Sequence, residues 1–243
     1  MTVASSAIAF EVRQCAALTA DVVQVRLIPS QAKAPRYRAG QYLKVQLPDG
    51  TLRALSIASP PEAEHIELQV RVSPDRPASQ VLLGHFRPGT TITCQLPFGN
   101  CCLPEDPRPV VMIAGGTGIS PMRAMITSSI ARGESREIWL YWGGTSPEAL
   151  FLDAELRALA AAHPRLHYRP VVEQASSSWP GAIGLPHLVA KREHPSFASL
   201  SVFCSGSAAM ARAVYRTLQA HGLPFEQFHC DWIEIFRARN EPF

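Results

Sequence analysis

The first hundred residues alternate short apolar runs with turn residues, and this pattern predicts a domain built from β-strands. Runs of strand length, either apolar or alternating in polarity, cover Ile8–Val12, Val22–Ile28, Tyr42–Leu47, Leu52–Ile57, Ile66–Val72 and Thr91–Leu96. Proline and glycine residues, which mark turns, separate them at 48–50, 60–61 and 88–89. This spacing of short strands predicts a small antiparallel barrel or sandwich. One helical stretch, near Ser79–Phe86, interrupts the strands.

A proline-rich stretch at positions 104–109 ends this pattern, because three prolines in six residues are typical of a linker. Strand-like and helical runs then alternate, which predicts an open, mostly parallel α/β sheet. The expected strands are Val110–Ala114, Ile138–Trp142, Leu166–Val172, Ser201–Cys204 and Phe228–Phe236. The expected helices are Pro121–Ala131, Pro147–Ala161, Pro186–Lys191 and Ala208–Ala220. We therefore expect a β-barrel domain over residues 1–103, a linker over 104–109 and an α/β domain over 110–243.

The composition indicates an ordinary globular protein. The 243 residues are 47% hydrophobic and 18% charged, as in most folded globular chains. A net charge of +3 gives no reason to expect nucleic acid or a membrane surface as partner. No apolar run reaches membrane-spanning length, and Met1–Phe10 lacks the basic start of a secretion signal. We expect a cytoplasmic location.

Neither the six cysteines nor the eight histidines show the spacing of a metal site. The chain has no C-x-x-C pair, no C-x₄-C-x₂-C run and no H-E-x-x-H motif. We therefore expect neither a bound metal nor a built-in iron–sulfur cluster. Most of the cysteines are expected to be reduced residues of the core.

The most informative stretch joins the first strand of the α/β part to its helix. The apolar run Val110–Ala114 ends in Gly115-Gly116-Thr117-Gly118, and a helical pattern follows. Ser120 is suited to the N-cap and Pro121 to the first helical position. Backbone N–H groups and the helix dipole favour an anion at such a helix start. The pattern predicts that a phosphate-bearing cofactor lies across this turn.

Two common phosphate-binding turns are excluded. No Gly-Lys-Ser/Thr follows the glycines, so the turn is not a P-loop. In the usual dinucleotide fingerprint G-x-G-x-x-G/A, Pro121 would occupy the third small position, and no acidic residue ends the second strand at Tyr141–Thr145. A strand-to-helix turn that needs glycine only for its own geometry remains an alternative.

The expected barrel strand around Ser56 holds a second set of candidates. Alternation along a strand places Arg53, Leu55 and Ile57 on one face and Ser56 on the other. A guanidinium suits a phosphate, and a serine hydroxyl can hydrogen-bond a ring nitrogen. Taken alone, Arg53 is more typical of an edge-strand residue in a surface ion pair.

Two further candidates lie near the carboxyl ends of later strands. Cys204 ends a strand that passes through Ser205-Gly206-Ser207 into a helix, and ligands bind where parallel strands end. A small buried core residue is the alternative for Cys204. Asp231 interrupts the apolar run Phe228–Phe236, where it either faces outward or orients a ligand.

Four motifs follow one another in a recognisable order. They are Arg53-Ala54-Leu55-Ser56 with Ser59, Pro97-Phe98-Gly99, the turn Gly115–Pro121, and Cys204-x-Gly206-x-x-x-Met210. This order resembles the ferredoxin–NADP⁺ reductase superfamily over nearly the whole chain. Tyr141–Gly144, Pro170–Gln174 and the lack of a ferredoxin domain make it similar to the stand-alone NAD(P)H–flavin reductases.

The resemblance implies a flavin-binding antiparallel β-barrel followed by an open parallel α/β domain that binds NAD(P)H. It implies hydride transfer from nicotinamide C4 to flavin N5, in the cleft between the domains. Ser56 would hydrogen-bond N5, Cys204 would lie near C4, and Asp231 would help to orient the reacting pair. The cofactor-binding residues that it implies are Arg53, Leu55, Ser56, Ile57, Ser79, Gly115, Gly116, Thr117, Gly118, Ile119, Ser120, Pro121, Gly144, Cys204, Ser205 and Gly206.

Two departures from the family pattern concern how firmly flavin is held. Leu55 replaces the aromatic residue that stacks on the flavin, and Ser73–Ser79 lacks the glycines that usually cover the pyrophosphate. Both favour an enzyme that takes FAD or FMN loosely and releases reduced flavin to another protein or to oxygen. The alternative is a reductase component that retains FAD and passes electrons to a separate ferredoxin or oxygenase protein. The choice between NADH and NADPH stays open, with Arg212 a candidate for a 2′-phosphate.

Overall fold

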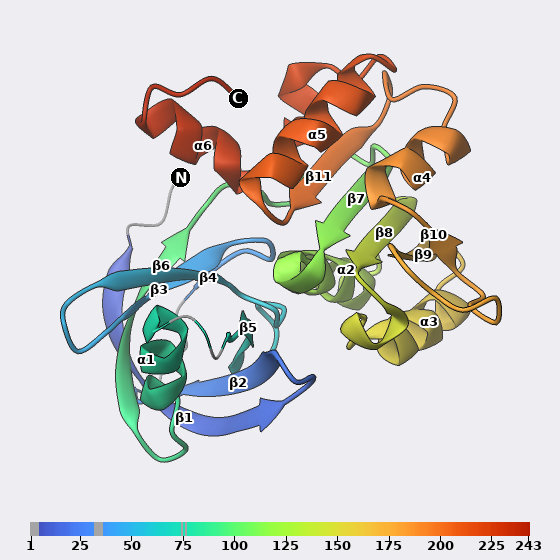
Figure 1. Ribbon diagram of the computed structural model, residues 1–243. Helices are drawn as coiled ribbons and strands as arrows, with labels where there is room; N and C mark the ends of the chain where they lie inside the picture. Colours follow the sequence, from blue (N-terminus) through green and yellow to red (C-terminus); the bar gives the residue numbers. More distant parts are fainter. Residues whose placement is uncertain (1–4, 32–35, 74, 76) are drawn as a thin grey trace. The chain divides into compact units, whose positions relative to one another are not determined.

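The computed structural model describes residues 5–31, 36–73, 75 and 77–243, which form two compact units (Figure 1). The first unit holds the described residues up to Leu103 together with Ser120–Ser129, and the second holds Pro104–Ile119 and Ile130–Phe243. The domain limits 1–103, 104–109 and 110–243 stay a prediction.

The first unit is a six-stranded antiparallel sheet that closes on itself. Its strands are β1 (Ser6–Ala17), β2 (Val22–Pro29), β3 (Tyr42–Gln46), β4 (Leu52–Ser56), β5 (Ile66–Arg71) and β6 (Thr91–Phe98). The order across the sheet is β4-β3-β6-β1-β2-β5. Ile57, just after β4, forms an antiparallel bridge to Leu68 of β5, so the two ends of the sheet meet. The antiparallel barrel expected from the sequence is confirmed.

Alternating apolar residues of these strands fill the barrel. Phe10, Val25, Leu43 and Ile92 are among the buried residues of a single core cluster. Helix α1 (Pro77–His85) adds Leu82 to this cluster. Burial of such side chains is the main favourable contribution to folding. The core thus fixes which face of β4 points inward.

The second unit is a parallel sheet of the order β10-β9-β8-β7-β11-β12. Its strands are β7 (Val110–Gly115), β8 (Ile138–Gly144), β9 (Leu166–Val172), β10 (Ala182–Ile183), β11 (Ser201–Ser205) and β12 (Phe228–His229). Its helical segments are η1 (Gly116–Gly118), η2 (Pro147–Ala149), α3 (Asp153–Ala162), α4 (Pro186–Glu193), α5 (Ala208–Gln219), η3 (Phe225–Gln227) and α6 (Asp231–Ala238). Helix α2 (Ile119–Ala131) follows η1 and is divided between the units. The predicted parallel α/β architecture is confirmed.

The strand order reverses between β7 and β11. From β7 the chain adds β8, β9 and β10 on one side, and it then returns to place β11 and β12 on the other side. Helix α3 packs against β9, α4 against β7 and β8, and α5 against β11. In open parallel sheets, ligands bind at the carboxyl ends of the strands where the order reverses. The topology therefore directs attention to the ends of β7 and β11.

The predicted last strand, Phe228–Phe236, is wrong beyond its second residue. Only Phe228–His229 is a strand, and Asp231–Ala238 forms α6. Its apolar residues have helical spacing, and Trp232 and Phe236 stack one turn apart at 5.7 Å. Acidic residues in the first turn favour a helix start. Asp231 is therefore the first residue of a helix and not a strand residue.

Two helix starts also differ from the prediction. The expected helix Pro147–Ala161 is split into η2 and α3, with residues 150–152 between them. Helix α2 begins at Ile119, so Ser120 and Pro121 lie within its first turn and Ser120 is not the N-cap. Among the residues that the structure describes, no helix has the length and apolar character needed to cross a bilayer.

Candidate functional site

Two strand-to-helix turns lie side by side in the second unit. One follows β7 through Gly115–Gly118, and the other follows β11 through Ser205–Ser207. The strands are neighbours, with Ser205 opposite Ala114. Both turns therefore lie at the point where the strand order reverses, which is where open α/β sheets bind ligands.

The glycines of these turns are explained by close packing. A Cβ on Gly118 would lie 2.1 Å from the backbone oxygen of Ser205, and one on Gly115 or on Gly206 would lie 2.6 Å from Met210 Sδ. Gly116 has a φ of +53°, in the left-handed region that favours glycine. Close packing therefore explains why these positions are glycines, and it gives the two turns one tightly packed edge, while the phosphate contact stays a prediction.

Two tryptophan side chains hold the carbonyl groups of these turns. Trp142 Nε1 on β8 donates to the Gly116 oxygen at 2.8 Å, and Trp232 Nε1 on α6 donates to the Gly206 oxygen at 2.9 Å. The Ser207 hydroxyl caps α5 by accepting a hydrogen bond from the Met210 N–H. The sequence interpretation assigned no role to either tryptophan, because nothing in their spacing shows where an indole N–H points.

The other site residues expected in this unit lie around the same edge or near it. Cys204, 4% exposed, is the penultimate residue of β11 and pairs with Ile113 of β7. Gly144 ends β8, and its carbonyl accepts a hydrogen bond from the Glu173 N–H at 3.0 Å. Asp231 starts α6 directly before Trp232, so it is tied to the second turn through that neighbour's indole.

Arg212 has partners in the C-terminal segment. Its guanidinium lies 4.0 Å from the centroid of the Phe236 ring, and Nη2 donates to the Pro242 oxygen at 3.0 Å. A weak ion pair with Glu241 at 3.9 Å adds to these contacts. Arg212 lies on α5, and its side chain packs against Phe236 of α6, a contact that the sequence did not indicate.

The candidate flavin strand, β4, presents two faces. Leu55 packs against the barrel core, and Ile57 beyond it is fully buried, whereas Arg53 is exposed. Ser56 lies opposite Tyr42 of β3 and is partly exposed. Arg53, which the predicted alternation placed on the same face as Leu55 and Ile57, is exposed, and Leu55 and Ser56 are buried to a similar degree, so the predicted position of Ser56 on the other face stays a prediction.

An aromatic pair lies next to Ser56. Tyr42 stacks on Phe98 of β6 with ring centroids 5.6 Å apart, and Lys44 Nζ lies 4.1 Å from the Phe98 centroid. Phe98 belongs to the motif Pro97-Phe98-Gly99, but nothing in the sequence connects Tyr42 with Ser56. Only the β3–β4 register shows that the two residues are direct cross-strand partners.

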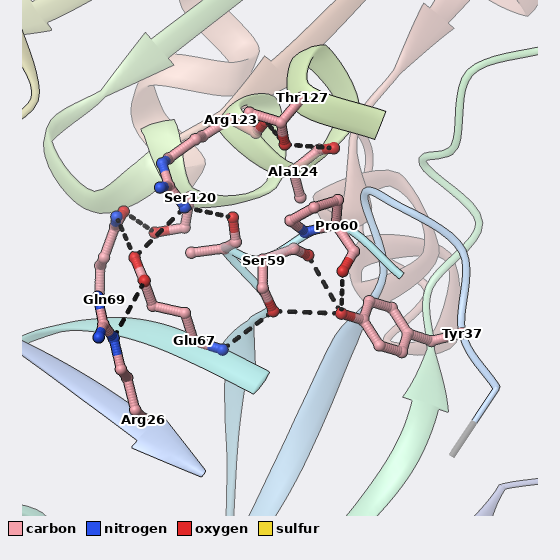
Figure 2. A network of polar contacts seen from close by, with 11 residues as sticks. Arg26, Tyr37, Ser59, Pro60, Glu67, Gln69, Ser120, Arg123, Ala124 and Thr127 are labelled. Atoms are coloured by element: carbon pink, nitrogen blue, oxygen red, sulfur yellow. Dashed lines mark hydrogen bonds and ion pairs between the residues drawn. The ribbon is translucent and has the colours of Figure 1, made fainter. Parts of the chain in front are cut away.

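A buried polar network includes Ser59, which lies three residues after the end of β4 and is the last residue of the Arg53–Ser59 motif (Figure 2). The Ser59 hydroxyl accepts a hydrogen bond from the Glu67 N–H at 3.0 Å and lies 3.2 Å from the Tyr37 hydroxyl. Burial raises the pKa of Tyr37 to about 12, so its phenol stays protonated and can donate. Tyr37 lies 2.9 Å from the Pro60 oxygen and fixes the chain after β4.

Glu67 is the charged centre of this network, and it is 3% exposed. Arg123 Nη1 lies 3.4 Å and Arg26 Nε 3.8 Å from its carboxylate oxygens (Figure 2). Its neighbour Gln69 accepts a hydrogen bond from the Ser120 hydroxyl at 2.8 Å. Ser120, expected to contact the nicotinamide nucleotide, thus also has a structural partner within the first unit.

The stretch Ser73–Ser79 is described in part, since Pro74 and Arg76 lie outside the described residues. The Ser79 hydroxyl accepts a hydrogen bond from the Ser73 N–H at 3.0 Å. Ser79 is the third residue of α1, and the first N–H groups of a helix have no partner within that helix. The expected contact of Ser79 with a flavin phosphate stays a prediction.

Two known domain families match the two parts of the chain. Residues 9–102 match the family described as "Oxidoreductase FAD-binding domain", and residues 112–216 match the "Oxidoreductase NAD-binding domain". The chain therefore combines an oxidoreductase FAD-binding domain with an oxidoreductase NAD-binding domain, and the predicted flavin and nicotinamide cofactor classes are confirmed.

Two relatives and one solved structure are similar to the chain over most of its length. It is 31% identical to the NAD(P)H-flavin reductase of Aliivibrio fischeri, over 84% of this chain and 88% of that protein. It is 32% identical to the CDP-6-deoxy-L-threo-D-glycero-4-hexulose-3-dehydrase reductase of Yersinia pestis, over 86% of this chain, and it spans only 63% of that protein's length. The crystal structure of the Amycolatopsis cytochrome P450 reductase GcoB is similar, with a TM-score of 0.87 and 26% identity over 95% of this chain and 70% of that one.

The chain belongs to the ferredoxin–NADP⁺ reductase superfamily, as its motifs indicated.

We expect Gly118→Ala to lower the free energy of unfolding by about 1–3 kcal/mol, the usual cost of overpacking. The added methyl would collide with the Ser205 backbone, which cannot move as a flexible side chain can. Gly84→Ala in α1 is the control, because nothing lies within 4 Å of the added Cβ. Since alanine favours a helix, Gly84→Ala should stabilise the protein by about 0.5–1 kcal/mol. Urea unfolding measures both, and equal effects would contradict the packing argument.

We expect Glu67→Ala to lower the free energy of unfolding by about 1–3 kcal/mol, because Arg123 and Gln69 lose a buried acceptor. Arg13→Ala is the control: it removes an ion pair whose side chains are 68% and 45% exposed. Its effect should stay within about 0.5 kcal/mol. Urea unfolding measures the free energy of unfolding of both variants. An unchanged free energy of unfolding in Glu67→Ala would show that the network is not stabilising.

Proposed function

We propose that the protein is an NAD(P)H-dependent flavin oxidoreductase that takes up flavin loosely and releases it in reduced form. The observation that carries the proposal is the paired turn edge in a chain whose barrel strand β4 exposes Arg53 and Ser56. The 88% coverage of an NAD(P)H-flavin reductase by this chain supports it. A cytoplasmic location, expected from the sequence, remains part of the proposal.

The residues of the barrel fit a flavin. The exposed Arg53 supplies a cation for a flavin phosphate, and the Ser56 hydroxyl supplies a hydrogen bond for ring atom N5. Leu55 and Ile57 form the apolar floor beneath that strand. The stacked pair Tyr42 and Phe98 offers an aromatic surface beside Ser56. A flavin held by these residues would supply the hydride acceptor, ring atom N5, for a reduced nicotinamide.

The residues of the paired turns fit a nicotinamide nucleotide. The backbone N–H groups of Gly115–Ile119 and of Ser205–Gly206 would hold the phosphates, since helix starts favour anions. Cys204 would pack beside the nicotinamide as a small, weakly polar side chain, and Gly144 would border the adenosine half. Asp231 would orient the nicotinamide from the start of α6. The protein's contribution is orientation and the exclusion of water.

Weak flavin retention follows from two features of the barrel. Leu55 gives a flavin ring no aromatic stacking partner, and the stretch ending at Ser79 has no glycines through which its backbone could approach a pyrophosphate closely. The second candidate function is a reductase component that retains FAD and passes electrons to a separate protein. The names of the Yersinia and Amycolatopsis relatives, both reductases for other enzymes, favour this second candidate.

The proposal is tested by dialysing the purified protein and then following NADH and NADPH oxidation with riboflavin, FMN or FAD. We expect a colourless protein that oxidises the nucleotide only when flavin is added. Ser56→Ala should lower kcat/KM about tenfold, the effect of one lost hydrogen bond, while the exposed loop variant Ser178→Ala should not. Flavin retained at full stoichiometry would favour the second candidate, and no oxidation with any flavin would refute both.

We expect Leu55→Tyr to tighten flavin binding about two- to tenfold, because a phenol ring adds stacking that leucine lacks. Ile183→Tyr on the exposed edge strand β10 is the matched control and should leave flavin affinity unchanged. Quenching of flavin fluorescence on titration measures both dissociation constants. Unchanged affinity in Leu55→Tyr would show that position 55 does not face the bound flavin.

A further inference from the structure

The two indole–carbonyl hydrogen bonds at the paired turns have a common geometry that the proposed function does not use. Trp142 comes from β8 and Trp232 from α6, which are far apart in sequence. Each donates Nε1–H to the carbonyl of a glycine in a different turn, at 2.8 and 2.9 Å. Both distances are those of good N–H···O hydrogen bonds.

We propose that Trp142 and Trp232 are positioning residues of the nucleotide site: each indole fixes one turn so that its backbone N–H groups point at the phosphates of NAD(P)H. The proposal rests on the proposed function, because it concerns the same nucleotide. It adds two side chains that need not touch the ligand and that act through Gly116 and Gly206.

The carbonyl of Gly116 is fully occupied by protein donors. It accepts hydrogen bonds from the backbone N–H of Ile119 and from Trp142 Nε1. The Trp142 side chain is fully buried, and its ring meets Phe151 edge to face at 5.2 Å. The indole therefore cannot follow a shift of the turn, and the direction of the Gly116 carbonyl is set by the core of the second unit.

The second indole is held by stacking. The Trp232 ring lies 5.7 Å from Phe236 with an interplanar angle of 29°, and the Arg212 guanidinium lies 4.0 Å from the centroid of the Phe236 ring. This series of contacts joins α5, which starts at the second turn, to α6. The direction of the Gly206 carbonyl is thus set by the C-terminal helix.

A fixed carbonyl also fixes the next N–H. In a planar trans peptide the C=O and N–H bonds point in opposite directions. The Thr117 N–H therefore points away from Trp142, and the Ser207 N–H points away from Trp232. Thr117 precedes α2 and Ser207 is the N-cap of α5. At both positions a directed N–H strengthens the attraction of the helix start for an anion.

The test measures nucleotide binding and turnover in Trp142→Phe and Trp232→Phe. Calorimetric titration with NADH, NADPH and the oxidised nucleotides gives binding without turnover, and steady-state kinetics with added FMN separates kcat from KM. We expect dissociation constants and KM for the preferred nucleotide to rise about three- to tenfold, the effect of one hydrogen bond. kcat and the KM for FMN should stay within twofold of the wild type.

Trp179→Phe is the matched control. Trp179 Nε1 donates to the Ala182 oxygen at 3.2 Å, which is the same kind of bond in the loop before β10. We expect its nucleotide constants to equal those of the wild type. An equal rise in this variant would overturn the proposal, since the effect would then follow from any lost indole bond.

A second variant removes the risk that phenylalanine leaves a cavity at position 142. Replacing Trp142 by benzothienylalanine keeps the bicyclic shape but exchanges the N–H for sulfur. Nucleotide binding weakened as in Trp142→Phe supports the proposal, and wild-type binding overturns it. If the wild-type protein binds neither nucleotide, the proposed function fails; if it binds and the variants bind equally well, only the role of the indoles fails.

Discussion

The contact between the Gly118 position and the Ser205 carbonyl is the constraint on which the nucleotide half of the molecule depends. A methyl group at position 118 would lie 2.1 Å from that oxygen, so the two turns can pack in this way only without a side chain there. Met210 fills the space beside Gly115 and Gly206 for the same reason. The turns thus behave as one rigid edge, and the adjacency of β7 and β11 places that edge where the strand order reverses.

A different kind of constraint organises the barrel half. There the buried carboxylate of Glu67 forms ion pairs with Arg26 and Arg123. The neighbouring Gln69 accepts a hydrogen bond from the Ser120 hydroxyl. Removing one member of a buried polar network leaves the others without partners, which costs more than a surface pair contributes. Apolar packing shapes the interior of the barrel, and this network fixes the chain after the flavin strand through Ser59.

The periodicity of apolar residues was enough to predict both sheets. A strand buried on one face has alternating apolar residues, and a strand buried on both faces has a continuous apolar run. The periodicity failed at Asp231–Ala238, where four closely spaced apolar residues satisfy strand and helix patterns alike and only the acidic first turn separates them. Motif order was enough to predict the glycine turn, Ser56 and Cys204 as site residues, and these roles stay predictions. The indoles of Trp142 and Trp232, the pair Tyr42–Ser56 and the carboxylate of Glu67 could not be predicted, because long-range register and side-chain direction decide those contacts.

Helix α2 carries a consequence for how this chain can be divided. Ile119 belongs with the second unit and Ser120–Ser129 with the first, although the proline-rich stretch at 104–109 lies ahead of both. Recombination at that stretch would join the barrel to a different helix in place of α2. Buried Glu67 would then lose Arg123, and Gln69 would lose the Ser120 hydroxyl. The two units are therefore not interchangeable modules. The barrel and helix α2 must be kept together, although the proline-rich stretch between them has the sequence of a linker.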